Sequence, residues 1–175
     1  MSIERRSGIG GPLVAGPAAT GGRPTALSGY AARFNSPATI GGLFEERIAP
    51  GAFRAAAGAG NTVALFNHDS ARVLGRQSNN TLVLREDAKG LYFTIHPPDT
   101  QDGRDVLTLV KRGDVAGCSF AFTVEKDRWS FPSGPDALPR REILKVGSLL
   151  DVGPVTYPAY PSTNVEAKAA TRRRS

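Results

Sequence analysis

Apolar residues recur along this chain mostly in short runs, and this pattern predicts a domain built largely from strands. The runs are bounded by Gly, Pro, Asn and Asp, which are typical of turns. Two of them flank Lys89 and Gly90, which indicates a hairpin. The predicted strands lie within residues 27–34, 43–48, 61–69, 81–87, 91–95, 113–124 and 141–157, the last as one or two strands.

Two segments have helical patterns instead. Residues 50–58 open with Pro, are rich in Ala and end with Gly, which predicts a short helix. Residues 99–113 form the clearest helix, in which Asp102 can cap the N-terminus and Gly113 can take the left-handed C-terminal conformation. Few helices among many strands predict an α+β, predominantly β fold, a closed or nearly closed β-barrel flanked by a few helices.

The strand after the second helix carries two residues that can act as nucleophiles, Cys118 and Ser119. Side chains alternate along a strand, so Cys118 shares a face with Phe120 and Phe122, which predicts that the thiol is buried in the core. Ser119 lies on the opposite face among small residues. Alternation alone favours the solvent face of an edge strand for Ser119, although its small neighbours also leave room for another group to approach.

Composition limits the class of protein. With 175 residues and 40% hydrophobic content, the chain suits one domain with a real core. We find no apolar run near the ~20 residues that a membrane span needs, and no apolar core of a signal peptide near the N-terminus. One cysteine excludes an internal disulfide framework and fits a reducing compartment.

The net charge of +6 is concentrated at the two ends of the chain. Three arginines against one glutamate in residues 1–25, and four basic residues against one glutamate in residues 165–175, account for all but about +1 of it. The nearly neutral body disfavours specific nucleic-acid binding. Residues 7–22 are rich in Gly, Ala and Pro and have no apolar period, so we expect a flexible N-terminal arm over residues 1–26. We expect a folded domain over residues 27–165 and a basic, flexible tail over residues 166–175.

A serine needs a base to become a nucleophile, and the chain has two histidines. His68 lies where an apolar strand meets polar residues, a common place for catalytic groups, whereas His96 lies beside two prolines. Asp151 is a carboxylate within an apolar segment and needs a partner. Asp69 is adjacent to His68 but points to the other face, so Asp151 ranks above it. These residues alone leave a structural reading of the histidine and serine open.

Six segments, taken together in their order along residues 27–165, resemble a known family. This is the family of prohead maturation proteases of tailed phages, the caudovirus prohead serine protease family. The segments are GYAARFN (29–35), FEERIAPGAF (44–53), VALFNHDSARVLGR (63–76), GLYFTIHPPDTQDGRD (90–105), VKRGDVAGCSFAF (110–122) and LLDVGPVTYPAYPSTNV (149–165).

This resemblance implies a serine endopeptidase with a fold similar to the herpesvirus assembly protease, assemblin. It maps the catalytic histidine onto His68, the nucleophile onto Ser119 and the acidic member onto Asp151. At this last position the family more often has Glu, and two residues further on it has Ser-Leu where this chain has Gly153-Pro154. Two histidines and one cysteine make no zinc set, so we expect no metal or cofactor.

The resemblance also implies partners and a place of action. The enzyme would cleave the scaffold segment from the major capsid protein inside the assembling prohead, in the cytoplasm of the bacterial host. It would then cleave itself within residues 1–26 or 164–175, and the resemblance allows a homodimer. A loop carrying Arg140 and Arg141 is a candidate contributor to oxyanion binding.

Three alternatives remain from the sequence. The first is a cysteine protease that uses Cys118, which the alternation of faces disfavours. The second is a non-catalytic capsid-assembly chaperone on a protease fold. The third is a β-barrel binding module, which the neutral body and the lack of an aromatic platform disfavour for nucleic acid.

Overall fold

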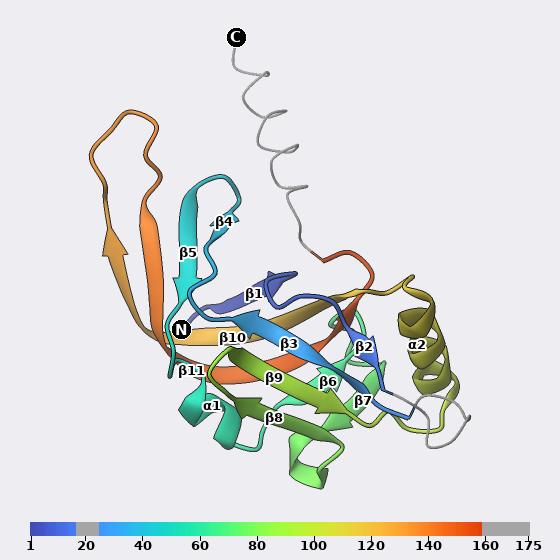
Figure 1. Cartoon of the computed structure of the whole chain (residues 1–175). Coiled ribbons are helices and arrows are strands. Elements are labelled where there is room, and N and C mark those ends of the chain that lie inside the picture. The colour runs from blue at the N-terminus through green and yellow to red at the C-terminus, as the bar shows by residue number, and fades with distance from the viewer. Residues whose placement is uncertain (17–24, 159–175) are drawn as a thin grey trace.

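Strands dominate the part of the chain that this computed structural model describes, residues 1–16 and 25–158 (Figure 1). Across these described residues the domain is predominantly β with two short α-helices, as the apolar pattern predicts. The elements in chain order are β1 Ile3–Ser7, β2 Val14–Ala15, β3 Leu27–Arg33, β4 Ala38–Ile40, β5 Phe44–Ile48, α1 Arg54–Gly58, β6 Val63–Leu65, β7 Val73–Arg76, the 3-10 helix η2 Gln77–Asn79, β8 Leu82–Glu86, β9 Gly90–Ile95, α2 Gln101–Arg112, β10 Gly117–Ser130 and β11 Arg140–Val155.

Within the described residues, the strands pair into two sheets. The larger has seven strands in the order β1-β10-β11-β5-β4, with β6 paired to β11 and β7 paired to β6. The smaller has four strands in the order β2-β3-β9-β8 and contains the predicted β8–β9 hairpin. Apolar side chains of both sheets, such as Phe93 and Phe120, share one buried core. Closure of the sheets into a barrel stays a prediction.

The strands β10 and β11 form a long antiparallel ribbon that extends beyond the rest of the domain (Figure 1). Strand β10 continues to Ser130 and β11 begins at Arg140, so the loop between them covers only residues 131–139, and Arg140 and Arg141 lie on β11 rather than on a loop as expected. Side-chain contacts stabilise this polar end of the ribbon. Arg141 donates from Nε to Asp127 at 2.7 Å, and the ring of Trp129 lies 5.0 Å from that of Phe44.

Helix α2 confirms the prediction over residues 99–113 with one correction at its start. Its N-cap is Thr100, whose hydroxyl accepts from the Gly103 N–H at 3.3 Å. Asp102, which we expected to cap the helix, instead accepts from the Arg72 guanidinium at 2.8 and 2.9 Å. Gly113 ends the helix with φ 85°, as expected for a left-handed C-terminal residue.

Part of the predicted flexible arm is ordered. Strand β1 pairs antiparallel with β10, and β2 pairs with β3, so residues 3–7 and 14–15 differ from the expectation for residues 1–26. The glycine and proline content that suggested flexibility begins only after β1. Residues 17–24 and the predicted basic tail lie outside the described residues. Within the described part of the chain, no helix combines the length and apolar character needed to cross a membrane.

Candidate active site

Ser119 and Asp151 lie on neighbouring strands and share one face of the larger sheet. In the β10–β11 register, Ser119 is opposite Gly153 and Ala121 is opposite Asp151. Opposed residues share a face, and residues two apart on one strand do so as well. The other face of β10 carries Phe120 into the core, as alternation predicts.

His68 reaches this face from the turn that follows β6. Strand β6 runs parallel to β11, with Val63 opposite Asp151, so the chain leaves β6 close to Gly153. Asn67 and His68 both have positive φ angles, 54° and 58°, which is uncommon for residues other than glycine. Such strained conformations persist only where the surrounding structure holds them.

Hydrogen bonds to the end of β11 hold this turn. The Asn67 N–H donates to the Pro154 carbonyl at 3.0 Å. The Asn67 amide also donates to the Thr156 hydroxyl at 3.1 Å, and its side-chain oxygen accepts from the Thr156 N–H at 2.8 Å. The strand that carries Asp151 therefore also positions His68.

A close approach of two backbones explains the glycine at position 153. A Cβ atom on Gly153 would lie 1.9 Å from the Leu65 carbonyl oxygen, well inside contact distance. A residue with a side chain here would push β6, and the turn behind it, away from β11. Glycine is therefore the residue that fits at position 153 in this structure.

The three residues that the sequence predicts as catalytic form one hydrogen-bonded chain. His68 Nε2 lies 2.6 Å from Ser119 Oγ, and His68 Nδ1 lies 2.5 Å from Asp151 Oδ1. The His68 and Asp151 side chains are 20% and 12% exposed. With Nδ1–H donating to the carboxylate, Nε2 is free to accept the serine proton, which is the arrangement of a nucleophile, a base and an orienting acid.

The other candidate residues do not join this chain. Asp69 accepts from the Ala71 N–H at 2.9 Å within its own turn. His96 is exposed, at the end of β9. Within the described residues, no three His, Cys, Asp or Glu side chains group as ligands for a metal ion.

Ser119 is fully buried, with 0% exposure, because β10 is not an edge strand. Strand β11 lies on one side of it and β1 on the other. The expectation that Ser119 faces solvent on an edge strand is therefore wrong, because the sequence pattern does not predict β1. The Ser119 hydroxyl can also donate to the Arg6 carbonyl oxygen of β1, which lies 3.0 Å away. His68 Nε2 and this carbonyl oxygen therefore compete for the single hydroxyl proton of Ser119.

Cys118 is buried on the core face of β10, as predicted. Burial away from water raises the pKa of its thiol to about 12, an effect that its backbone hydrogen bonds only partly oppose. A thiol that stays protonated and faces the core is a poor nucleophile. The structure therefore argues against the cysteine-protease alternative.

Arg140 and Arg141 lie far along the ribbon from Ser119. They are opposite Ser130 and Trp129, whereas Ser119 is opposite Gly153. Arg140 pairs with an exposed Glu45, and Arg141 belongs to an ion cluster with Glu4, Glu46, Asp127 and Arg6. The expectation that they contribute to oxyanion binding is therefore wrong.

The ion cluster is mostly buried and was not predicted from the sequence. Burial opposes the charge of Arg141, but hydrogen bonds to Glu4 and Asp127 outweigh it and raise the pKa of its guanidinium. Arg6 pairs with Glu46 through both carboxylate oxygens, at 2.6 and 2.7 Å. These partners are far apart in sequence, and charged residues are common on protein surfaces. The sequence near each of them therefore gives no sign that they are buried together.

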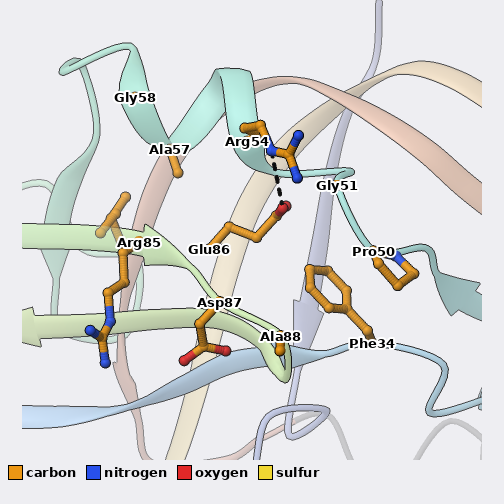
Figure 2. Close-up of a pocket in the computed structure, with 11 residues that line it drawn as sticks. Phe34, Pro50, Gly51, Arg54, Ala57, Gly58, Arg85, Glu86, Asp87 and Ala88 are labelled. Atoms are coloured by element: carbon orange, nitrogen blue, oxygen red, sulfur yellow. Dashed lines mark ion pairs between the residues drawn. The ribbon is translucent and has the colours of Figure 1, made fainter.

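A separate cavity of about 580 Å³ lies between α1 and the β8–β9 hairpin (Figure 2). Glu86 reaches into this region and accepts from the Phe53 N–H at 2.8 Å, while the guanidinium of Arg54 lies 3.8 Å from its other oxygen. Asp87 accepts from the Tyr30 hydroxyl at 2.8 Å. These acidic groups hold α1 and the hairpin in place, and the cavity lining does not include His68, Ser119 or Asp151.

Comparison with known proteins gives one family. The family model described as Caudovirus prohead serine protease matches residues 17–174. No curated protein and no solved structure matches the chain. The matched span contains His68, Ser119 and Asp151, and β1 precedes it.

Proposed function

The chain belongs to the caudovirus prohead serine protease family, a family of serine peptidases, and on that premise we propose that Ser119, His68 and Asp151 form its catalytic triad. Membership in this family implies proteolysis during prohead maturation. The observation that carries the assignment of residues is the hydrogen-bonded chain from Ser119 Oγ through His68 to Asp151, at 2.6 and 2.5 Å.

The proposed reaction is acyl transfer in two steps. Ser119 Oγ attacks the carbonyl carbon of the peptide bond while His68 Nε2 accepts the hydroxyl proton. The C–N bond breaks, His68 gives this proton to the leaving amine, and an ester remains on Ser119. Water then attacks the ester, loses a proton to His68, and releases the new carboxyl terminus as Ser119 recovers its proton.

Asp151 has two functions in this proposal. Its carboxylate accepts from Nδ1–H, so that the lone pair of His68 is on Nε2, next to Ser119. It also stabilises the imidazolium that forms when His68 takes the proton. Positioned general bases of this kind contribute about 10²–10⁴-fold to the rate.

The finer parts of the role follow from the same resemblance. We propose that the substrates are the major capsid protein, at its scaffold segment, and the enzyme itself, within residues 1–26 or 164–175. The reaction would take place inside the assembling prohead in the cytoplasm of the bacterial host. The proposal includes closure of the two sheets into a barrel similar to that of the herpesvirus assembly protease, and allows a homodimer.

Co-expression with the capsid protein of the same particle tests the proposal. Wild type, Ser119→Ala and Cys118→Ala are compared by gel mobility and intact mass of the capsid protein. We expect shortening with wild type and Cys118→Ala and none with Ser119→Ala. Shortening that survives Ser119→Ala would exclude Ser119 as the nucleophile. Assembled shells without shortening in any of the three would instead favour an assembly chaperone.

A further inference from the structure

Strand β1 lies along β10 in the way a protease holds an extended substrate. It pairs antiparallel with the strand that carries Ser119, with Ser7 opposite Ser119 and Arg6 opposite Phe120 (Figure 1). An extended chain added to a sheet edge is a common mode of peptide binding. The Arg6 carbonyl oxygen accepts from Ser119 Oγ at 3.0 Å, so the bond between Arg6 and Ser7 lies beside the proposed nucleophile.

The side chain of the same residue is bound by a buried carboxylate. Arg6 donates from Nε to one oxygen of Glu46 at 2.6 Å and from Nη2 to the other at 2.7 Å. The Glu46 side chain is only 2% exposed and that of Arg6 is 10% exposed. A bidentate guanidinium–carboxylate pair is directional as well as strong, which suits it to recognition of arginine.

The charges around Glu46 favour a cationic occupant even without β1. Glu4 and Arg6 both belong to β1 and would leave together, so their charges cancel. Glu46 and Asp127 would then face Arg141 alone, which leaves one net negative charge at the position that β1 vacates. A strand that binds here covers Glu46 again, and a carboxylate covered without a cationic partner is costly, so a basic side chain is the favoured ligand.

We propose that β1 is the enzyme's own substrate strand, that the bond between Arg6 and Ser7 is cleaved, and that Glu46 selects arginine on the amino side of the cleaved bond. This inference rests on the proposed function. It applies the same acyl transfer: the Arg6 carbonyl forms an ester with Ser119, His68 protonates the amine of Ser7, and water frees the Arg6 carboxylate. Strand β1 lies before the residues 17–174 that the family model matches.

Intact mass of the purified full-length chain tests the cleaved bond. We expect wild type to convert to a product that begins at Ser7, and Ser119→Ala to stay intact. Arg6→Gln should slow the conversion by about 100-fold, because the buried pair with Glu46 is lost. Arg5→Gln is the matched control: Arg5 is exposed, next in sequence and opposite Ala121, and its substitution should leave the rate unchanged. An intact N-terminus in an enzyme that still shortens the capsid protein would overturn the inference and leave the proposed function standing.

Synthetic peptides test Glu46 independently of any effect on folding. The probe is a peptide copying residues 1–12, with arginine or its neutral analogue citrulline at position 6. We expect wild type to cleave the arginine peptide about 100-fold faster in kcat/KM, and Glu46→Gln to lose most of this preference. Equal cleavage of the two peptides by wild type, or no cleavage of either, would overturn the inference whatever the variants do. If wild type cleaves neither the peptides nor the capsid protein, the proposed function itself is refuted.

Discussion

Replacing Asp151 with Asn removes the charge of the proposed third catalytic group while keeping its size. The carboxylate oxygen lies 2.5 Å from His68 Nδ1, and both side chains are largely shielded from water. An Asn amide can turn its NH₂ toward Nδ1 and donate to it. Nδ1 then becomes an acceptor and Nε2 carries the proton, so Nε2 can no longer accept the proton of Ser119.

The expected loss is large for so small a change. In Ser-His-Asp enzymes this substitution lowers kcat by about 10⁴-fold, which corresponds to roughly 5 kcal/mol of transition-state stabilisation. The assay is the rate of capsid-protein shortening by purified enzyme, with the melting temperature measured beside it to show that the fold is retained. Asp69→Asn is the matched control, because Asp69 is next to His68 but bonds only within its turn. An Asp151→Asn enzyme within tenfold of wild type would refute the role that we assign to this carboxylate.

Three further predictions concern packing, capping and the free thiol. Because burial raises the pKa of the Cys118 thiol from 9.0 to about 12, its thiolate population at pH 8 is about 1,000-fold lower than in the unfolded chain. Iodoacetamide labelling should therefore follow unfolding, and stability should fall as pH rises above about 9, where only the unfolded thiol ionises readily. Gly153→Ala should destabilise the fold by about 3 kcal/mol in denaturant titrations and slow cleavage, because its Cβ would meet the Leu65 carbonyl. Thr100→Ala should cost about 1 kcal/mol in the same titrations, whereas Asp102→Ala should leave the cap of α2 intact.

Local periodicity was sufficient to predict the side of β10 on which each candidate nucleophile lies. The alternation of large apolar and small residues places Cys118 in the core and Ser119 on the other face, and the structure has this arrangement. This inference succeeds because it depends only on residues that are close in sequence. The ranking of Asp151 above Asp69 assumed an extended chain at His68, whereas the structure has a turn there with positive φ at Asn67 and His68, and the Asp69 side chain bonds within that turn.

Pairings between distant segments could not be predicted in this way. Strand β1 has only five residues, three of them charged, and gains its place from the ladder with β10 and from the pair between Arg6 and Glu46, forty residues apart. The polar half of the β10–β11 ribbon likewise depends on cross-strand contacts. Because β1 cannot be predicted from the sequence, the burial of Ser119 beside it cannot be predicted either.

The helix cap shows a different limit, in which two local choices compete. Thr and Asp are both good N-cap residues, and Thr100 and Asp102 are separated by one residue. Asp102 is bound by the guanidinium of Arg72, which reaches it from the segment before β7. A distant side chain thus decides which of two suitable residues caps the helix.

The turn at His68 shows how the proposed base and acid depend on a single element. A left-handed conformation costs a residue other than glycine about 1–3 kcal/mol, and Asn67 and His68 adopt it in succession. Three hydrogen bonds between Asn67 and the residues Pro154 and Thr156 offset this cost, and all three involve the segment at the end of β11. Because β11 also carries Asp151, the strand that positions the carboxylate holds the turn that presents the imidazole. The Asn-His-Asp segment and the Asp-Val-Gly-Pro-Val-Thr segment are therefore two halves of one structural unit, and the distance from His68 to Asp151 is set by their contact.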